Sequence, residues 1–350
     1  MDSALTERQK TILEATVTDF IETAEPVGSK SLIEAKGFSL SSATIRNDLS
    51  ELEDKGYLTH VHTSSGRVPT DKGYRMYVDS LMTLQKLPPE QRQILNKQLA
   101  MIGNNVSDVL AQLTDVVSSL MDYTTLVLTP DIWRETLKVV HLVLLDLDKV
   151  LVVLLSSAGV NQEFVMSLEG LAQADLDRLS RLLTQKLEGK AAYQLTEDLF
   201  AELVSELPHF KIALTQLGTE IKRLVQSHKS RKLMSKGTSK MLRLPEFKNV
   251  EVTQKVLETL EESKVLCHLL DRYMNPSTSQ KTLIGEETQV ENLKECSLVF
   301  TPVMRDDEPV ALVGVLGPKR MMYPVVVPMI DRIGRMVSHS LTLHEKGVGS

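Results

Sequence analysis

Apolar residues recur along the chain with two different periods. From residue 6 to residue 123 they stand mostly three and four positions apart, which predicts helices. After residue 124 they form short, nearly continuous runs of Val and Leu, which predict buried strands. Helical spacing returns over residues 171–240 and in a final helix from Pro324 to about His344. The pattern therefore predicts an α+β chain with several domains.

The first 36 residues predict two helices. The first covers residues 6–22, and Thr6 with Gln9 has the spacing of a capping box. The second is short, residues 30–36, with Ser29 placed to cap it. Gly37 and Phe38 follow as a tight turn, since glycine readily ends a helix.

A third helix is predicted to begin at Ser41 or Ser42 and to end at Gly56. Its apolar residues Ile45, Leu49 and Leu52 recur at spacings of four and three, so we expect them to form one buried stripe. The opposite face carries small and polar side chains, namely Ala43, Asn47, Ser50 and Asp54, with Arg46 beside them. The acids of this helix lie in its later part, so its N-terminal half suits the major groove of DNA.

A short β-hairpin with a polar tip is predicted directly after this helix, over YLTHVH, TSSG and RVP. Helix, turn, helix and hairpin together predict a winged helix-turn-helix. Arg46 and Asn47 are the foremost candidates for base or phosphate contact, because Arg pairs with guanine and Asn with adenine. The full set of candidate DNA contacts is Ser42, Thr44, Arg46, Asn47, Ser50, Thr63, Ser64, Ser65, Gly66 and Arg67.

Each candidate also has a purely structural interpretation. Helix-turn-helix spacing occurs in ordinary helical bundles, and Arg46 and Asn47 would also suit a solvated helix face. Ser42 and Thr44 could cap the helix or bind phosphate at its N-terminus. Gly66 and Arg67 could form a plain hairpin turn with an exposed Arg, and His60 and His62 could be half-buried strand residues.

Two stretches resemble the HrcA family of bacterial heat-shock repressors, SATIRNDLSELEDKGYL and HTSSGRVPTDKGYRMYVD. A later segment, GVLGPKRMMYP, is similar to the family's GPxRMxY motif, at Gly317, Pro318, Arg320, Met321 and Tyr323. The resemblance implies three domains. They are a winged helix over residues 1–85, a GAF-like α/β sheet domain over 89–170 plus 245–345, and a mostly helical dimerisation domain inserted at 171–244.

The remaining elements follow from the pattern alone. One long helix is expected from Pro89 to Tyr123, with a break at Gly103-Asn104. Strands are expected at TTLVLTP, LKVVHLVLLDL, KVLVVLLSS and NQEFVMSL, covered on both faces because of their continuous Val and Leu content. Further helices are expected at 175–187, 197–207 and 210–235, and further strands at KTLIGEE, CSLVFTPVM and PVALVGVLGP.

Composition narrows the function. The formal net charge is −6, and residues 1–75 hold nine Lys and Arg against twelve Asp and Glu, so DNA binding would depend on local arrangement rather than total charge. Two cysteines, Cys267 and Cys296, are too few for a disulfide framework or a zinc site. We expect no enzyme, cofactor, metal or membrane span, since catalytic motifs are missing and charged residues interrupt the most apolar run. A cytoplasmic, nucleoid-associated protein is expected.

Two basic features remain open. Residues 222–243 carry eight Lys and Arg without an acid between them, which fits a solvated helix face better than a phosphate track. The turn Gly317-Pro318-Lys319-Arg320 could bind an anion, but packing against the sheet is the favoured use.

The sequence as a whole indicates a homodimeric transcriptional repressor that binds double-stranded DNA at an inverted repeat. The resemblance implies the operator called CIRCE, upstream of chaperone genes, and help from the chaperonin GroEL. One alternative is a repressor that senses a small molecule, of unknown identity, through the GAF-like domain. Another is a structural or chaperone-interacting protein in which the winged module only packs.

Overall fold

A computed structural model describes residues 5–36, 40–60, 66–100, 106–129, 136–156, 161–191, 194–226, 233–275, 277–305 and 308–346. The chain divides into two compact units. The main unit consists of Met1–Ala100, Thr114–Val127 and Ser235–Ser340, and the inserted unit consists of Met101–Leu113, Leu128–Met234 and Leu341–Ser350. Each unit has its own sheet and its own core.

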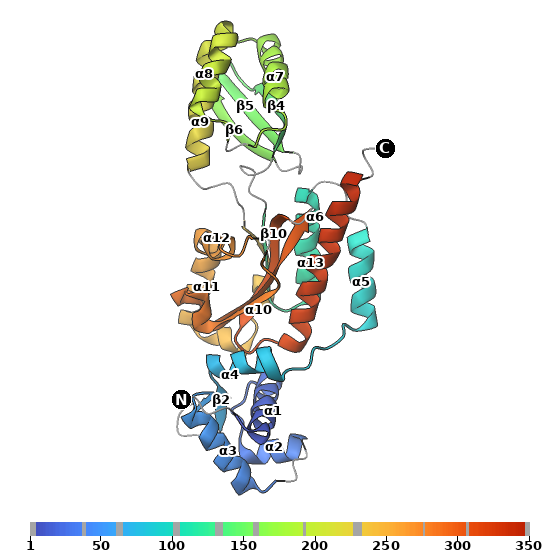
Figure 1. Ribbon diagram of the computed structural model, residues 1–350. Coiled ribbons are helices and arrows are strands. Elements are labelled where there is room, and N and C mark those ends of the chain that lie inside the picture. Colours follow the sequence, from blue (N-terminus) through green and yellow to red (C-terminus); the bar gives the residue numbers. More distant parts are fainter. Residues whose placement is uncertain are drawn as a thin grey trace. The chain divides into compact units, whose positions relative to one another are not determined.

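The main unit begins with three helices, a hairpin and a fourth helix (Figure 1). Their bounds are α1 Glu7–Thr23, α2 Ser29–Lys36, α3 Ser42–Asp54, β1 Leu58–His60, β2 Arg67–Pro69 and α4 Asp71–Met76, which continues as one π-helical turn, Tyr77–Leu81. Both halves of the capping box between Thr6 and Gln9 are present at the start of α1, as predicted. We call this part of the main unit, residues 5–81, the N-terminal domain. Strands β1 and β2 pair antiparallel and form the predicted wing.

The rest of the main unit is built on a five-stranded sheet in the order β7-β3-β10-β9-β8. Its strands are β3 Thr124–Leu128, β7 Leu233–Lys236, β8 Lys281–Ile284, β9 Cys296–Arg305 and β10 Glu308–Pro318. Figure 1 shows α6 and α13 along one side of this sheet and α11 and α12 along the other. The helices are α5 Pro89–Ala100, α6 Val106–Leu120, α10 Thr238–Met241, α11 Val250–Glu261, α12 Lys264–Asp271 and α13 Tyr323–Lys346. Short 3-10 turns cover Pro245–Lys248, Gly285–Thr288 and Glu291–Leu293.

Helices on both sides explain why the central strands are aliphatic throughout. Every residue of β3 is buried, and so are the first eight of β9. The register pairs Val315 with Val299 and Leu316 with Leu298, so both faces of the hairpin carry apolar side chains into a core. The prediction of cover on both faces is confirmed for β3, which was among the strands it concerned, and the same holds for β9, for which it was not made.

The inserted unit contains a second sheet of three antiparallel strands in the order β4-β5-β6. These strands are β4 Leu137–Leu144, β5 Lys149–Ser156 and β6 Asn161–Ser167, followed by α7 Gln173–Leu187, α8 Glu197–Glu206 and α9 Lys211–Gln226, with a 3-10 turn at Pro208–Phe210. One face of the sheet shares a core with these three helices, including Leu142 and Val152 from the strands and Leu179 and Leu214 from the helices. The other face is not part of that core.

This arrangement corrects the predicted domain division. Strands β4 to β6 were expected in one sheet with the C-terminal strands, but they form a separate sheet in the inserted unit. The insert therefore starts near residue 128 rather than 171, and it is an α/β unit rather than a mostly helical one. The predicted helix over 210–235 is also too long, because residues 233–236 form the edge strand β7 beside β3. A run of apolar residues predicts a strand, but it does not say which strands pair.

Candidate nucleic-acid interface

Helix α3 starts and ends where the sequence predicts. Ser41 is the cap, in an extended conformation, and its hydroxyl oxygen accepts a hydrogen bond from the backbone N–H of Thr44 at 3.1 Å. Gly56 follows the helix with a φ of 76°, a conformation that glycine adopts without strain. The apolar stripe consists of Ile45, Leu49 and Leu52, and each of these residues is at most 1% exposed. The stripe fixes which face of α3 points outward.

The acid in the middle of α3 points into the domain rather than toward solvent. The Asp48 side chain is only 2% exposed, and both its oxygens accept hydrogen bonds from Arg8 of α1, at 2.8 and 3.0 Å. The hydrogen bond and the charge of Asp48 raise the pKa of Arg8. The pair thus ties α3 to α1 and removes one negative charge from the outer face.

Two further acids of α3, Glu51 and Glu53, also have partners outside the helix. Glu51 accepts a hydrogen bond from the side-chain amide of Gln9 at 2.6 Å, and the carbonyl oxygen of that amide accepts one from Lys55 at 3.1 Å. Glu53 pairs with Arg67 at 3.1 Å and lies 3.3 Å from His60 of β1. Three carboxylates of the helix are therefore engaged with residues of α1 and the wing.

Arg67 and Gly66 pack within the domain and are not exposed on the wing. The Arg67 side chain is 10% exposed and bound to Glu53, so the prediction of an exposed, phosphate-reaching Arg67 is not supported. Gly66 is also buried, and a Cβ on it would lie 2.6 Å from Cβ of Pro26. The close approach of Pro26 explains why glycine stands here. Thr63, Ser64 and Ser65, predicted at the wing tip, lie outside the described residues.

The remaining predicted contacts divide into an exposed set and a set engaged in the turn. Arg46, Asn47 and Ser50 are exposed on the outer face of α3. Ser42 and Thr44 are half-buried: the Ser42 hydroxyl lies 3.0 Å from that of Ser29, and the Thr44 hydroxyl lies 2.9 Å from that of Ser41. The structure thus brings a guanidinium, an amide and a hydroxyl onto one accessible helix face, which are the groups that read base edges in the major groove.

Arg8 and Gln9 are the residues that sequence reasoning missed. Gln9 was identified as part of the capping box, and the structure shows that its amide also bonds to Glu51 and Lys55 of α3. The only signal for Arg8 in the sequence was an acid, Asp48, next to the apolar stripe of α3. Such an acid needs a buried partner, but the sequence does not say which cation provides it.

Four of the eight basic residues in 222–243 have partners within the protein, while Lys229, Arg231 and Lys232 lie outside the described residues. Lys222 pairs with Glu197 at 2.8 Å, and Arg223 pairs with Glu220. Lys236 pairs with Asp115, and Lys240 donates to the backbone carbonyl of Ser118 at 2.6 Å. These contacts do not form a phosphate track.

The described ranges contain neither a cluster of metal-binding side chains nor a membrane-spanning helix. No group of three or more His, Cys, Asp or Glu there lies close enough together to hold a metal ion. In the same ranges, none of the helices is both long and apolar enough to cross a membrane.

Known proteins resemble both ends of the chain and its full length. Residues 107–327 match the family model described as the HrcA protein C-terminal domain, and residues 31–67 match the DeoR-like helix-turn-helix domain. The heat-inducible transcription repressor HrcA of Moorella thermoacetica is 31% identical over 337 residues, which are 96% of this chain and 97% of that protein. The repressor of the same name from Pelotomaculum thermopropionicum is 34% identical over 348 residues, 99% of both chains. A crystal structure of a hypothetical protein at 2.2 Å resolution shares the fold, with a TM-score of 0.67, 22% identity and coverage of 97% of this chain and 99% of that one.

The pair between Arg8 and Asp48 makes an asymmetric stability prediction. Arg8→Met leaves a carboxylate buried without a partner, whereas Asp48→Asn keeps an acceptor for a guanidinium that is itself half-exposed. We expect Arg8→Met to lower the melting temperature by several degrees and Asp48→Asn to lower it less, measured by calorimetry. Lys10→Met, which removes the exposed Lys10–Glu7 pair of the same helix, is the control and should change little. Equal melting temperatures for Arg8→Met and Lys10→Met would contradict this account.

Proposed function

The chain belongs to the HrcA family of heat-inducible transcription repressors, and from that premise we propose that it binds an inverted-repeat operator as a homodimer. The observation that carries the proposal is the outer face of α3. There Arg46, Asn47 and Ser50 are exposed, while Asp48 and Glu53 are held away by Arg8 and Arg67. A DNA-facing helix needs this separation because carboxylates on the same face would repel phosphates.

In the proposed complex the N-terminal half of α3 enters the major groove. Arg46 and Asn47 donate to base edges or phosphates, and the first N–H groups of α3 lie near the backbone of the duplex. The wing tip, Thr63 to Ser65, stays a predicted contact. The chain is acidic overall, so we expect specific contacts to dominate and non-specific affinity to be modest.

The second sheet supports the homodimer. Its inner face packs on α7 to α9, and its outer face carries aliphatic residues on either side of a mixed row, His141, Val153 and Glu163. The register places Val143, Leu151 and Val165 in one row across all three strands, and Val139 beside Leu155 in another. In the described part of the inserted unit, no helix shares a core with this face, and Val165 is 53% exposed. An aliphatic sheet face is stable when another apolar surface covers it, and a second copy of the same sheet supplies one.

A dimer with two-fold symmetry presents two copies of α3 related by a dyad. Its operator should therefore consist of two half-sites in inverted orientation, separated by about one or two helical turns of roughly 10 bp each. The family resemblance identifies this operator with the inverted repeat CIRCE and the domain that holds the five-stranded sheet with a GAF-like domain; both stay proposals.

Arg46→Ala and Asn47→Ala test the reading face. Both side chains are exposed, so the variants should fold normally, and each should lose about 1–3 kcal/mol of operator binding, roughly 5- to 150-fold. Affinity for the chaperonin promoter and for a scrambled duplex is measured by fluorescence anisotropy over a series of salt concentrations. Arg178→Ala removes the same charge from an exposed position of α7 and is the matched control. Wild-type affinity and specificity in both variants would rule out this face as the reading surface.

Val165→Glu tests the dimer. Residue 165 is exposed in the single chain, so the monomer should fold normally with a carboxylate at this position. Burying that carboxylate against a second copy is unfavourable, so the dimer should dissociate. Sedimentation equilibrium measures the mass. Val250→Glu, at a 78% exposed position of α11, is the control and should keep the wild-type mass. A Val165→Glu protein that remains as dimeric as wild type would exclude this face.

We propose further that heat and the chaperonin GroEL modulate the repressor. The chain has only 4% aromatic residues, so its cores are aliphatic, and a modest rise in temperature should reduce the population of correctly folded dimer. Operator affinity should fall steeply across the heat-shock range and recover when chaperonin and ATP are present during cooling. Operator affinity that stays constant over this range, measured on the same duplex, would contradict the thermal part of the proposal.

A further inference from the structure

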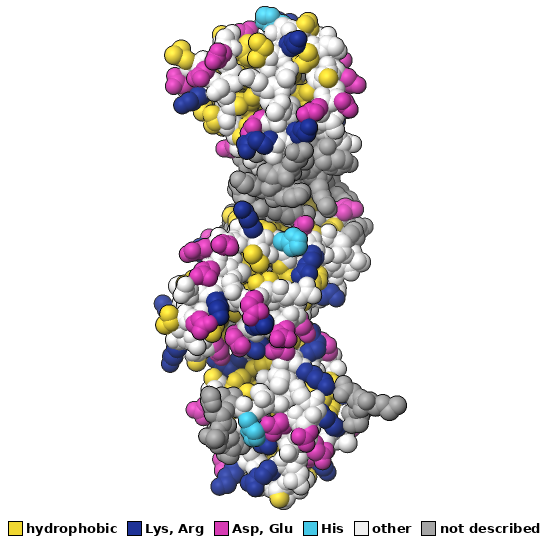
Figure 2. Space-filling model, turned by 90° about the vertical axis from the view of Figure 1, so that its left-hand side faces the viewer, with side chains coloured by type: hydrophobic (Ala, Val, Ile, Leu, Met, Phe, Trp, Pro, Cys, Tyr) yellow, Lys and Arg dark blue, Asp and Glu magenta, His cyan; other side chains and the backbone are white. Residues whose placement is uncertain are grey.

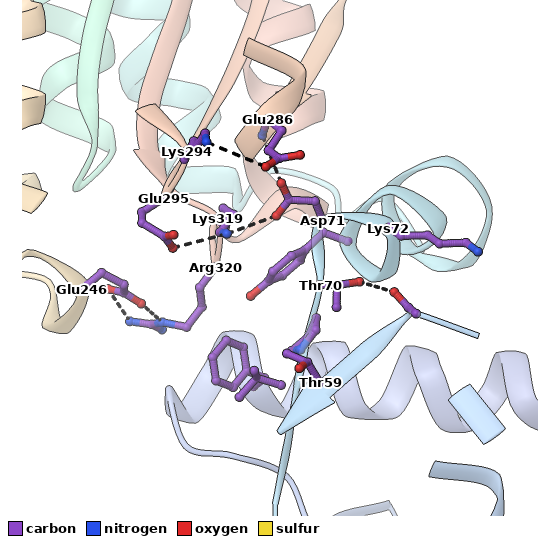
Figure 3. A pocket seen from close by; sticks show the side chains of 15 residues that line it. Thr59, Thr70, Asp71, Lys72, Glu246, Glu286, Lys294, Glu295, Lys319 and Arg320 are labelled. Carbon is purple, nitrogen blue, oxygen red and sulfur yellow. Dashed lines mark hydrogen bonds and ion pairs between the residues drawn. The ribbon is translucent and has the colours of Figure 1, made fainter. Parts of the chain in front are cut away.

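Two cations in the turn between β10 and α13 reach the N-terminal domain. The Lys319 ammonium lies 3.1 Å from one oxygen of Asp71, the first residue of α4, and 3.3 Å from Glu295. The Arg320 guanidinium donates to the backbone carbonyl of Ile21 at 2.7 Å and pairs with Glu246. These contacts join segments about 250 and 300 residues apart in the sequence, and Figure 3 shows Lys319 between Asp71 and Glu295.

Arg320 provides what α1 lacks. The last turn of α1 contains no basic residue, and its final carbonyl groups have no partner from within the helix. A cation at a helix C-terminus interacts favourably with the helix dipole, and Arg320 occupies this place at Ile21. The contact is directional, because the guanidinium also holds Glu246 on its other edge.

Asp71 is held from two sides. One oxygen accepts from Lys319, and the other accepts the backbone N–H of Glu286 at 3.0 Å. The approach is possible only because residue 285 is a glycine: a Cβ there would lie 2.1 Å from the carboxylate, and its φ is 52°. The loop after β8 is thus shaped to receive this side chain of α4.

Arg75 makes a third link one turn further along α4. Its guanidinium donates to the backbone carbonyl of Thr282 at 2.7 Å and to Glu287 at 2.8 Å. We call Asp71, Arg75, Lys319 and Arg320, with these partners, the clamp. It connects both ends of the N-terminal domain, α1 and α4, to the sheet domain.

Tyr323 holds the backbone that carries two residues of the clamp, Lys319 and Arg320. Its side chain is fully buried, and its hydroxyl donates to the backbone carbonyl of Lys319 at 2.7 Å. Since the single hydroxyl proton is used there, the hydroxyl of Ser297, 2.7 Å away, donates to the Tyr323 oxygen. Burial raises the pKa of Tyr323, so it remains a donor at every physiological pH. The backbone that carries Lys319 and Arg320 is therefore fixed to the sheet.

The pairs of the clamp are stronger than ordinary surface pairs. The Arg320 side chain is 13% exposed, and Lys319 and Asp71 are 25% and 28% exposed. Charges this far from solvent are screened less by salt than fully exposed ones. Acidic and basic side chains intermix over this part of the surface (Figure 2), around a cavity of about 560 Å³ lined by Asp71, Glu246, Lys319 and Arg320 among others. All four of these groups pair with one another or with neighbouring residues.

We infer that Asp71, Arg75, Lys319 and Arg320 are positioning residues that fix the orientation of α3 on the sheet domain and thereby set which half-site spacing the dimer accepts. The inference rests on the proposed function, since it concerns a symmetric operator. Adding one base pair between half-sites moves them by about 3.4 Å and turns them by roughly a tenth of a helical turn. A domain held at both α1 and α4 has less freedom to follow such a change than a loosely attached domain.

The test uses the full-length dimer and a series of duplexes in which the spacing between two inverted half-sites varies one base pair at a time. The wild type should bind one spacing much more tightly than its neighbours. Lys319→Ala/Arg320→Ala should retain wild-type affinity for a single half-site but lose about tenfold of the discrimination between spacings. A double variant that folds and keeps the wild-type spacing preference would overturn the inference.

Two further variants control for stability. Asp71→Asn removes the charge opposite Lys319 but keeps an acceptor for the Glu286 N–H, so it should fold normally and relax the spacing preference in part. Lys255→Ala removes a lysine from an exposed ion pair of α11 and should leave the preference unchanged. A loss of discrimination in Lys255→Ala equal to that in Lys319→Ala/Arg320→Ala would also count against the clamp.

Hydrogen exchange separates failure of the clamp from failure of the proposed function. The amide of Glu286 donates to Asp71 across the junction between the N-terminal and sheet domains, and the amide of Gln85, in the segment that follows the N-terminal domain, donates to Pro324 of the sheet domain. In Lys319→Ala/Arg320→Ala without DNA, both should exchange faster than in wild type, while amides in β9 keep their protection. Unchanged exchange at both amides would refute the clamp. Faster exchange combined with a wild type indifferent to inverted repeats would instead refute the operator proposal.

Discussion

The candidate DNA interface depends on the direction in which the carboxylates of α3 point. The helix carries four acids in thirteen residues, and the first 75 residues are net negative. A negative charge within about 8 Å of a phosphate is only partly screened at physiological salt. Asp48, Glu51 and Glu53 each turn toward a partner on α1 or the wing. The N-terminal half of the outer face then carries Arg46 and Asn47, and the remaining acid, Asp54, is exposed at the C-terminal end of the helix. An acidic domain can in this way still present a surface that DNA tolerates.

The same arrangement uses up most of the cations. Arg8 and Arg67 pair with acids of α3, and Lys55 donates to the side-chain amide oxygen of Gln9 in α1. Lys72 lies over the Tyr57 ring at 4.5 Å, and Arg75 bonds to the sheet domain. Few positive charges are left for phosphates, so the electrostatic, sequence-independent part of DNA affinity must be small. Discrimination then has to come from geometry: which bases α3 reaches, and how its orientation is held. This is why contacts far from α3, in the turn at Lys319 and Arg320, bear on recognition.

Sequence patterns predicted local features well, because they report local physics. The capping box of Thr6 and Gln9, the cap at Ser41, the stop at Gly56 and the stripe of α3 are all confirmed. Partners distant in sequence could not be read in this way. Nothing in the pattern linked Arg8 to Asp48 or Lys319 to Asp71. Arg67 was expected to be exposed, but its side chain is 10% exposed and pairs with Glu53. The assignment of strands to sheets was wrong for the same reason, since β4 to β6 form a sheet of their own and do not join the sheet that contains β9.

The two sheets show what continuous Val and Leu content does and does not mean. In β9 the composition reflects helices on both faces, and its first eight residues are buried. In β5 the side chains alternate between buried and half-buried, because only one face packs on α7 to α9. Continuous Val and Leu content therefore indicates that both faces of a strand are apolar, but it does not identify what covers each face. On the outer face Val143, Leu151 and Val165 form one aliphatic row, and the neighbouring row of His141, Val153 and Glu163 is mixed. The proposed homodimer would bury the aliphatic row, and in that proposal the inserted unit supplies the two-fold symmetry that an inverted repeat requires.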